Sequence, residues 1–318
     1  MAELHRTTGR WRLGLCLSLL TATLWGSLPV ALKTLLATMS PLTVTWYRYL
    51  ISLTLLTLIL RWRGQLPAAA KLRAAGALLT GMAVGFLGNN ILFLVGLNYV
   101  GPSAAQVVIQ LAPVLLIASG VLIFGEPFGR WQWMGVAILL GGMALFFHRG
   151  LAAAATSPGV LIIIAAAAFW AGSSMAQKQL LRDLPSLAVM WAAYGCGAVL
   201  LLPVTSPMEA RSLDTVGWLF LLYCALNGLI AYGCFAEAMA HWEVSRVSAV
   251  LATTPLFTPL FTELAARQWP DRIPHEGLNW LQVAGGALVA GGSMLAALAR
   301  RKSSTLLTEF AEDSSRET

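Results

Sequence analysis

Long apolar stretches alternate with short polar connections along almost the whole chain. A helix that crosses a bilayer needs roughly 17 to 25 apolar residues, because backbone groups left unpaired in hydrocarbon are costly. Ten stretches meet this condition, and loops rich in proline and glycine separate most of them. They predict transmembrane helices at residues 13–36, 42–60, 76–98, 103–124, 131–147, 159–181, 186–203, 215–240, 247–266 and 278–299.

Composition supports the same interpretation. Of the 318 residues, 58% are hydrophobic and 11% are charged, whereas soluble domains carry about a quarter charged residues. The net charge of +7 does not indicate nucleic-acid binding, because the basic residues lie between apolar stretches and form no continuous stripe. The first stretch is longer than the core of a signal peptide, so we expect it to remain as the first helix.

Lysine and arginine are distributed unevenly between the two sides of the predicted helices. With the N terminus placed in the cytoplasm, 15 of the 21 fall on the cytoplasmic side and five on the outer side, and Arg48 is left inside the second helix. Positive residues in short loops tend to stay in the cytoplasm. We therefore expect a multi-pass protein of the bacterial inner (plasma) membrane with both termini cytoplasmic.

The chain repeats itself at an offset of 145 residues, which drifts to 142 and then to 150 along the helices. The matched pairs include Trp25 with Trp170, Trp46 with Trp191, Tyr49 with Tyr194, Phe93 with Phe235, Pro113 with Pro255, Gly135 with Gly285 and Gly142 with Gly292. Each copy holds five predicted helices. Because five is odd, the second copy enters the membrane upside down, as in many secondary transporters.

The sequence thus predicts an all-α integral membrane protein in which ten transmembrane helices form two inverted five-helix repeats. We expect the first repeat at residues 13–147, the second at 159–299, and a polar cytoplasmic tail at 300–318.

Two motifs of the first repeat carry a family resemblance. The segment from Trp25 to Lys33, with the sequence WGSLPVALK, resembles the opening motif of the drug/metabolite transporter superfamily, EamA branch. Trp46 to Arg48 resembles the helix that follows it. Pro113, the segment Gly125-Glu126-Pro127 and the glycines of residues 131–147 resemble the motif near the end of each repeat.

The resemblance covers residues 13–299, with a departure in the second copy. Gln268 stands about where the second glutamate of the closing motif would fall, and residues 269–275 look inserted. The resemblance implies export of small metabolites, often amino acids, driven by the proton gradient or by the substrate's own gradient.

Polar side chains inside the apolar stretches are the candidates for a substrate site, because such groups are costly unless they face a partner or a water-filled cavity. Gln106 and Gln110 lie four residues apart, on one face of a helix. The other candidates are Asn89, Asn90, Asn227 and Tyr232, together with the repeat pair Trp25 and Trp170. For the amides the alternative is hydrogen bonding between helices, and for the tryptophans it is plain packing.

Few ionisable residues fall within the predicted helices. We expect Arg48 to extend toward the interface or pair with backbone carbonyls rather than bind an anion. Glu237 and Glu263 are the candidates for proton coupling, with placement near the two interfaces as the alternative. Pro113 and Pro255 each remove a helical hydrogen bond, which either exposes backbone carbonyls to a substrate or only tilts the helix.

The weighed functions are a transporter, an intramembrane enzyme and a non-transporting scaffold. No catalytic residues, metal ligands or cofactor are predicted, because the four histidines lie at helix ends or in loops and the four cysteines show no ligand spacing. The absence of a nucleotide-binding P-loop excludes ATP drive within this chain. Nucleotide-sugar or sugar-phosphate exchange is disfavoured, because phosphates would need clustered Lys and Arg. The expected partners are a small-molecule substrate and membrane lipid, with no nucleic acid, and the oligomeric state stays open.

Overall fold

A computed structural model describes residues 10–115, 129–180, 184–242 and 244–298, and within these ranges the chain is helical with no strand. The helices are α1 (Trp11–Leu35), α2 (Pro41–Trp62), α3 (Ala69–Ala74), α4 (Gly76–Tyr99), α5 (Pro102–Val108), α7 (Arg130–Phe146), α8 (Leu151–Thr156), α9 (Pro158–Leu180), α10 (Ser186–Leu201), η1 (Leu202–Val204), η2 (Pro207–Ser212), α11 (Thr215–His241), α12 (Val244–Leu251), α13 (Thr254–Gln268) and α14 (Trp280–Leu298).

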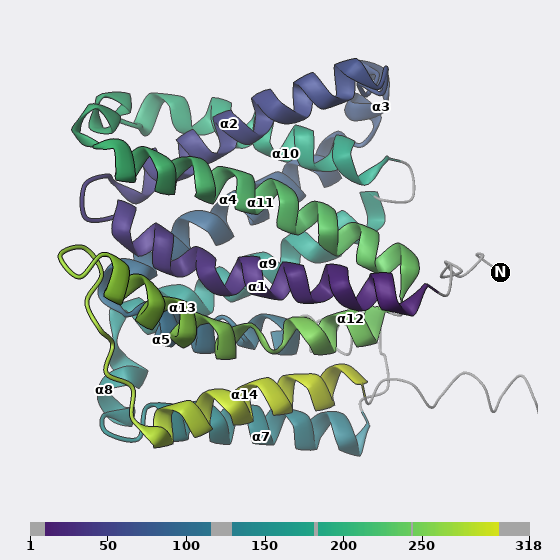
Figure 1. The fold of residues 1–318 in the computed structure, drawn as a ribbon. Coiled ribbons are helices and arrows are strands. Elements are labelled where there is room, and N and C mark those ends of the chain that lie inside the picture. The colour runs from purple at the N-terminus through teal and green to yellow at the C-terminus, as the bar shows by residue number, and fades with distance from the viewer. Residues whose placement is uncertain (1–9, 116–128, 181–183, 243, 299–318) are drawn as a thin grey trace, which may run out of the picture.

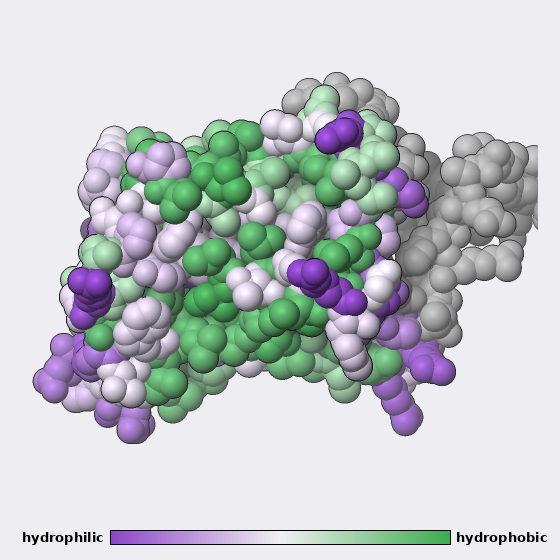
Figure 2. Space-filling view, turned by 90° about the horizontal axis from the view of Figure 1, so that it is seen from above, coloured by the Kyte–Doolittle hydropathy of each residue, from purple (hydrophilic) through white to green (hydrophobic). Residues whose placement is uncertain are grey.

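Eight helical segments of the described chain are long and apolar enough to cross a membrane, with α12 and α13 together forming one of them. The segment Pro102–Leu115 is apolar but shorter, and α7 has 17 residues. The rest of the predicted helix 103–124 and the Gly125-Glu126-Pro127 motif lie outside the described residues, so the count of ten stays a prediction. Figure 2 shows a broad apolar band with hydrophilic residues gathered at both ends of the bundle, as a membrane protein requires.

Equivalent helices of the two copies lie at matching levels of the bundle, and α2 with α10, α5 with α13, and α7 with α14 are in direct contact. Figure 1 shows, from top to bottom, α2 at the level of α10, α4 at that of α11, α1 at that of α9, α5 at that of α13, and α7 at that of α14. The contacts are reciprocal, because α1 packs on α11 and its counterpart α9 packs on α4. Such exchange of partners is what a two-fold relation produces.

Direct contacts show that the equivalent helices run in opposite directions. Trp46 Nε1 on α2 donates to the carbonyl oxygen of Ala198 on α10 at 3.0 Å. Its repeat counterpart Trp191 donates back to Thr57 Oγ1 at 2.8 Å. Residue numbers therefore rise along α2 as they fall along α10, and the two repeats are inverted.

Glycines allow α7 and α14 to approach until their backbones touch. A Cβ added to Gly142 would lie 2.7 Å from the backbone nitrogen of Val289, and one added to Gly285 would lie 2.6 Å from that of Phe146. The nearest atoms are backbone atoms of the facing helix, which cannot move aside as a flexible side chain could. Small residues at such seams are typical of helix packing in membranes.

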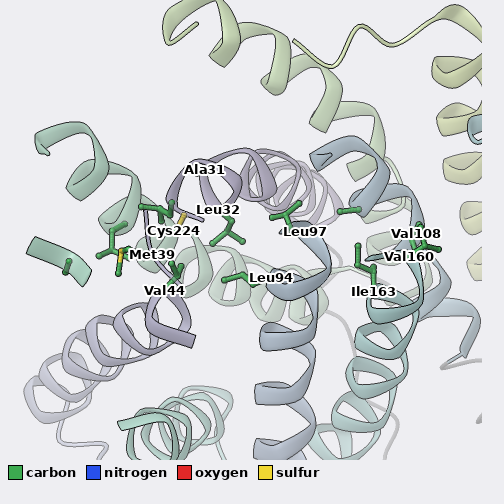
Figure 3. Close-up of a cluster of buried hydrophobic side chains, with 14 residues drawn as sticks. Ala31, Leu32, Met39, Val44, Leu94, Leu97, Val108, Val160, Ile163 and Cys224 are labelled. Carbon is green, nitrogen blue, oxygen red and sulfur yellow. The ribbon is translucent and has the colours of Figure 1, made fainter. Parts of the chain in front are cut away.

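The end of the bundle where α1 finishes, called here the distal end, is closed by an apolar cluster. Figure 3 shows Leu32 of α1, Leu94 and Leu97 of α4, and Val108 of α5 converging with residues of α9 and α11. Leu32, Leu94 and Leu97 are each at most 1% exposed. This cluster forms the distal floor above which the candidate site lies.

Polar contacts join loops and helix ends over this cluster. Lys33 Nζ donates to the carbonyls of Leu97, Asn98 and Val100 at 2.5, 3.1 and 3.2 Å, which caps the C-terminal turn of α4. The Glu276 carboxylate accepts hydrogen bonds from the backbone N–H and the hydroxyl of Ser103 at the start of α5. Burial raises the pKa of Glu276 above its ordinary value, while the Ser103 bonds and Lys33 oppose this shift.

Candidate functional site

The helix that begins with α5 is interrupted at Ile109 and Gln110, in the middle of the bundle. Helical structure ends at Val108 and resumes at Leu111. Pro113 has no N–H to offer the carbonyl of Ile109, which instead accepts from Ala112 at 2.9 Å in a tighter turn. Pro113 therefore causes the break in this helix.

The second repeat has the equivalent break between α12 and α13. Pro255 cannot donate to the carbonyl of Leu251, and the chain turns at Ala252 and Thr253 before α13 begins. The two breaks touch, because Gln110 Nε2 donates to the carbonyl oxygen of Ala252 at 3.0 Å. Interrupted helices that meet at mid-bundle form substrate sites in other secondary transporters.

A cavity of about 410 Å³ lies beside the paired breaks. Both repeats line it, with contributions from α1, α2, α4, α5, α9, α11, α12, α13 and α14. Its volume falls within the range of roughly 300 to 1,000 Å³ that small-molecule sites occupy. Leu32 and Leu94 of the apolar cluster form its distal floor, and Ala297 lines it near the opposite end of α14.

Seven of the eight residues predicted for the substrate site line this one cavity. They are Trp25, Asn89, Asn90, Gln106, Gln110, Trp170 and Tyr232. The structure shows that these residues, which come from five helices, lie around one cavity. Their contact with a substrate stays a prediction.

Asn227 is the exception, and it lies in the α1–α11 interface. It is 1% exposed, and its Nδ2 donates to the carbonyl of Leu24 at 2.6 Å and to the Tyr223 hydroxyl at 3.1 Å. The side chain of Asn227 is thus directed at the neighbouring helix instead of the cavity, as the alternative of hydrogen bonding between helices expects. A contact of Asn227 with substrate stays a prediction.

The amides that line the cavity differ in how far the protein already satisfies them. Asn89 Nδ2 donates across to the carbonyl of Ala166 on α9 at 2.9 Å, and Asn90 Nδ2 donates to Phe86 O of its own helix at 2.9 Å. Gln110 bridges the two breaks. Gln106 has no hydrogen-bonding partner among the residues that the structure describes, so its whole amide remains available to a ligand.

Aromatic side chains form one wall of the cavity. The rings of Trp25 and Tyr232 meet edge to face with centroids 5.3 Å apart, and Trp25 also contacts Phe235 at 5.8 Å. Trp170 and Phe93 complete the aromatic lining. Such a wall suits an organic ligand with an apolar part.

Arg48 also lines the cavity, which sequence reasoning missed. Its side chain does not extend to the interface, since the residue is only 7% exposed. The expected pairing with a backbone carbonyl is present but long, at 3.5 Å from Nε to the carbonyl of Cys224. The signal that could have found it is its position as the one cation left inside a predicted helix.

The two coupling candidates lie outside this cavity. Glu263 is 44% exposed and contacts Arg267 and His275 at 3.0 and 2.9 Å. Glu237 is 62% exposed and contacts His241 at 3.0 Å. Glu237 does line a smaller cavity of about 180 Å³, and Tyr232 borders both cavities. Their role in coupling stays a prediction.

Comparison with known proteins agrees with this architecture. The model of the EamA-like transporter family matches the chain twice, at residues 12–148 and 157–298. The chain belongs to the EamA-like transporter family. The two matches cover the two inverted repeats, so this EamA-like protein is a multi-pass membrane transporter.

Relatives of this EamA-like chain are named as transporters. An "Uncharacterized transporter" of Haemophilus influenzae is 36% identical over 91% of this chain and 96% of its own length. The "Uncharacterized inner membrane transporter YhbE" of Escherichia coli K12 is 36% identical over 91% and 92%. A "Probable amino-acid metabolite efflux pump" of Salmonella typhimurium is 24% identical over 87% and 92%.

A solved structure shares the fold. The structure titled "Crystal structure of protein" matches with a TM-score of 0.65 and 19% sequence identity, covering 92% of this chain and all of the other. This match shows the arrangement of the helices alone.

Proposed function

We propose that this transporter exports small metabolites, with amino acids the preferred class, across the bacterial inner membrane by alternating access between its two inverted repeats. The observation that carries the proposal is the single cavity of about 410 Å³ at the two helix breaks, to which both repeats contribute.

The chemistry of the cavity supports this substrate class. It combines an aromatic wall with amides and one cation, Arg48. A zwitterionic compound with an apolar side chain would find a partner for each of its parts there. Phosphorylated substrates carry two negative charges and call for a cluster of cations, and the described lining has one. The relative from Salmonella typhimurium, named as a probable amino-acid metabolite efflux pump, also favours amino acids.

The alternating-access mechanism is supported by the asymmetry of the cavity. Its distal floor is sealed by the apolar cluster and by the Lys33 and Glu276 contacts. The inverted repeat places the equivalent helix segments at the opposite end, so closing that end while the distal end opens would move the opening from one side to the other. With both termini cytoplasmic, as the distribution of Lys and Arg predicts, the distal end faces outward.

An intramembrane enzyme is the second candidate from a different class, and the lining disfavours it. Arg48 and Tyr232 are the cavity's ionisable residues in the described chain, and they form no nucleophile–base pair. No group of three or more His, Cys, Asp or Glu that could hold a metal ion occurs in the part of the chain that the structure covers. We expect no cofactor.

Efflux from proteoliposomes tests the proposal. The purified protein is reconstituted, vesicles are loaded with a panel of labelled amino acids, and release is compared with that from protein-free vesicles. The variant Ser248→Phe fills the cavity, whereas Thr54→Phe adds the same ring on an exposed face of α2. We expect release of at least one amino acid, retained by Thr54→Phe and lost in Ser248→Phe. Equal release from protein-free vesicles, or normal release by Ser248→Phe, would contradict the proposal.

A further inference from the structure

Arg48 is a buried cation whose charge the described protein leaves uncompensated. Its guanidinium carries five N–H donors, and two hydrogen bonds are formed, from Nε to Cys224 O and from an Nη to Asn90 Oδ1, both at 3.5 Å. These lengths are at the outer limit for a hydrogen bond. Both acceptors are neutral, so they cannot balance the charge.

No carboxylate of the described chain pairs with Arg48. Among the described residues, three acidic side chains form ion pairs, and none of their partners is Arg48. They are Asp214, Glu237 and Glu263. Glu276 and Glu209 cap helix ends at the distal end. A buried cation without a counter-ion costs several kcal/mol in desolvation, which an arriving anion would recover.

The surroundings of Arg48 leave it directed at the cavity. On the protein side the Cys224 carbonyl accepts from its Nε, and the adjacent Tyr49 packs its ring against that of Tyr194. Gly228, which also lines the cavity, keeps the space beside the guanidinium open: a Cβ there would come within 4.0 Å of an Arg48 Nη and within 3.6 Å of the Tyr194 hydroxyl. The open cavity face is thus the direction from which the remaining N–H donors can be reached.

We propose that Arg48 binds a carboxylate of the transported molecule, so that the cavity selects small monoanionic or zwitterionic carboxylates over analogues that lack the carboxylate. The planar guanidinium matches both oxygens of a carboxylate. This inference rests on the proposed function in placing the substrate in this cavity, and it adds the chemical group that is recognised and the residue that recognises it.

Gln106 supplies a second contact for such a molecule. It is 7% exposed, lines the same cavity and has no partner among the described residues. An amide can accept from an ammonium or donate to a carboxylate. Gln106 alone does not discriminate between an acid and its amide, whereas Arg48 does.

The test compares acids with their carboxamides in binding and in efflux. Thermal stabilisation of the detergent-purified protein reports binding, and proteoliposome release reports transport. The probes are the amino acids of the efflux panel and their C-terminal amides, which keep size and ammonium but remove the anion. Variants are Arg48→Gln, which removes the charge, and Arg48→Lys, which keeps it without the planar fork.

We expect the wild type to bind acids about tenfold or more tightly than amides, since hydrogen bonds to charged groups contribute about 1.5–3 kcal/mol. Arg48→Gln loses this preference, and Arg48→Lys keeps part of it. Wild-type efflux with equal use of acids and amides would overturn the role of Arg48 while leaving the export function intact. Acid-selective binding that Arg48→Gln abolishes, without efflux of any probe, would support the role of Arg48 and overturn the export function. If Arg48→Gln does not fold, the comparison of acids with amides in the wild type still tests whether the cavity recognises a carboxylate.

Discussion

The two repeats share positions that build the bundle and some aromatic positions of the cavity wall, such as Trp25 and Trp170, and they differ at the position of the cavity's one cation. On α2 and α10, Trp46 and Trp191 each donate a hydrogen bond to the facing helix, and the rings of Tyr49 and Tyr194 meet at 5.2 Å. Between these paired residues, however, α2 carries Arg48 where the repeat offset places Ala193 on α10. The shared residues therefore fix the frame, and a single unshared residue introduces the charge.

The same division separates the two ends of the cavity. Ala297 of α14 lines the cavity, whereas its counterpart Phe147 of α7 packs against the distal apolar cluster. The methyl group of Ala297 leaves space at its end of the cavity, whereas the phenyl ring of Phe147 fills the equivalent space at the distal end. The difference teaches that a symmetric backbone can hold a cavity closed at one end by side chains that differ between the repeats, together with the Lys33 and Glu276 contacts. Each prediction below alters either the glycine seam or a carboxylate.

The largest effect is expected from the shared glycine seam. Gly142→Ala and Gly292→Ala place a Cβ against backbone of the facing helix, which costs about 1–3 kcal/mol for overpacking. The adjacent Gly141 and Gly291 face open space, so Gly141→Ala and Gly291→Ala are matched controls that are neutral or slightly stabilising. Thermal unfolding in detergent measures all four. If Gly142→Ala and Gly292→Ala were as stable as the controls Gly141→Ala and Gly291→Ala, the seam would not be close-packed.

An intermediate effect is expected from Glu276, which binds the start of α5 at the distal end. Its pKa is raised by burial, so its contribution to stability is full below the ordinary glutamate pKa and is lost as pH rises through the raised value. Glu276→Gln cannot titrate. We expect the difference in melting temperature between wild type and Glu276→Gln to change across this window, with the wild type losing stability toward neutral pH. A difference that is constant with pH would contradict the assignment.

The smallest effects are expected from the two exposed carboxylates. Glu263 is paired with Arg267 and His275 and lines neither cavity, so Glu263→Gln should leave pH-gradient-driven efflux unchanged. Glu237 borders the smaller cavity that shares Tyr232 with the main one, so Glu237→Gln should reduce the response to the gradient partially. Efflux with and without an imposed pH gradient measures both. A larger loss in Glu263→Gln than in Glu237→Gln would reverse this ranking.

The sequence predicted the frame well because hydrophobic length and the repeat depend on the chain alone. The helix bounds predicted for residues 76–98 and 131–147 differ from α4 and α7 by one residue at most. The short helices α3 and α8 were not predicted, since they are too short to show a periodic pattern. The prolines predicted the two breaks but not that Gln110 would bridge them.

The direction of individual side chains could not be predicted, because it depends on how far each helix is rotated by its neighbours. Asn227 illustrates this. The offset of 142 places it opposite Gly85, and Gly85 packs against Phe169 of α9 as Asn227 does against Leu24 of α1. A glycine at the equivalent position indicates a close helix contact, which was the available signal that Asn227 faces a helix. The position of Arg48 in the cavity lining could not be predicted for a related reason, because the burial of Arg48 follows from packing of α2 against α10 and α11.

The most direct test of the central claim, that the cavity between the repeats is the transport site, is substrate-protected labelling of a cysteine within it. In a background without Cys16, Cys196, Cys224 and Cys234, Ser248→Cys places a thiol in the cavity lining, and Ser52→Cys places the same thiol at a buried site outside it, 2% exposed. We predict that a small polar thiol reagent modifies Ser248→Cys faster than Ser52→Cys, and that the amino acid selected by the efflux panel slows only the former. Equal labelling rates, or labelling that the exported amino acid does not slow, would contradict the claim.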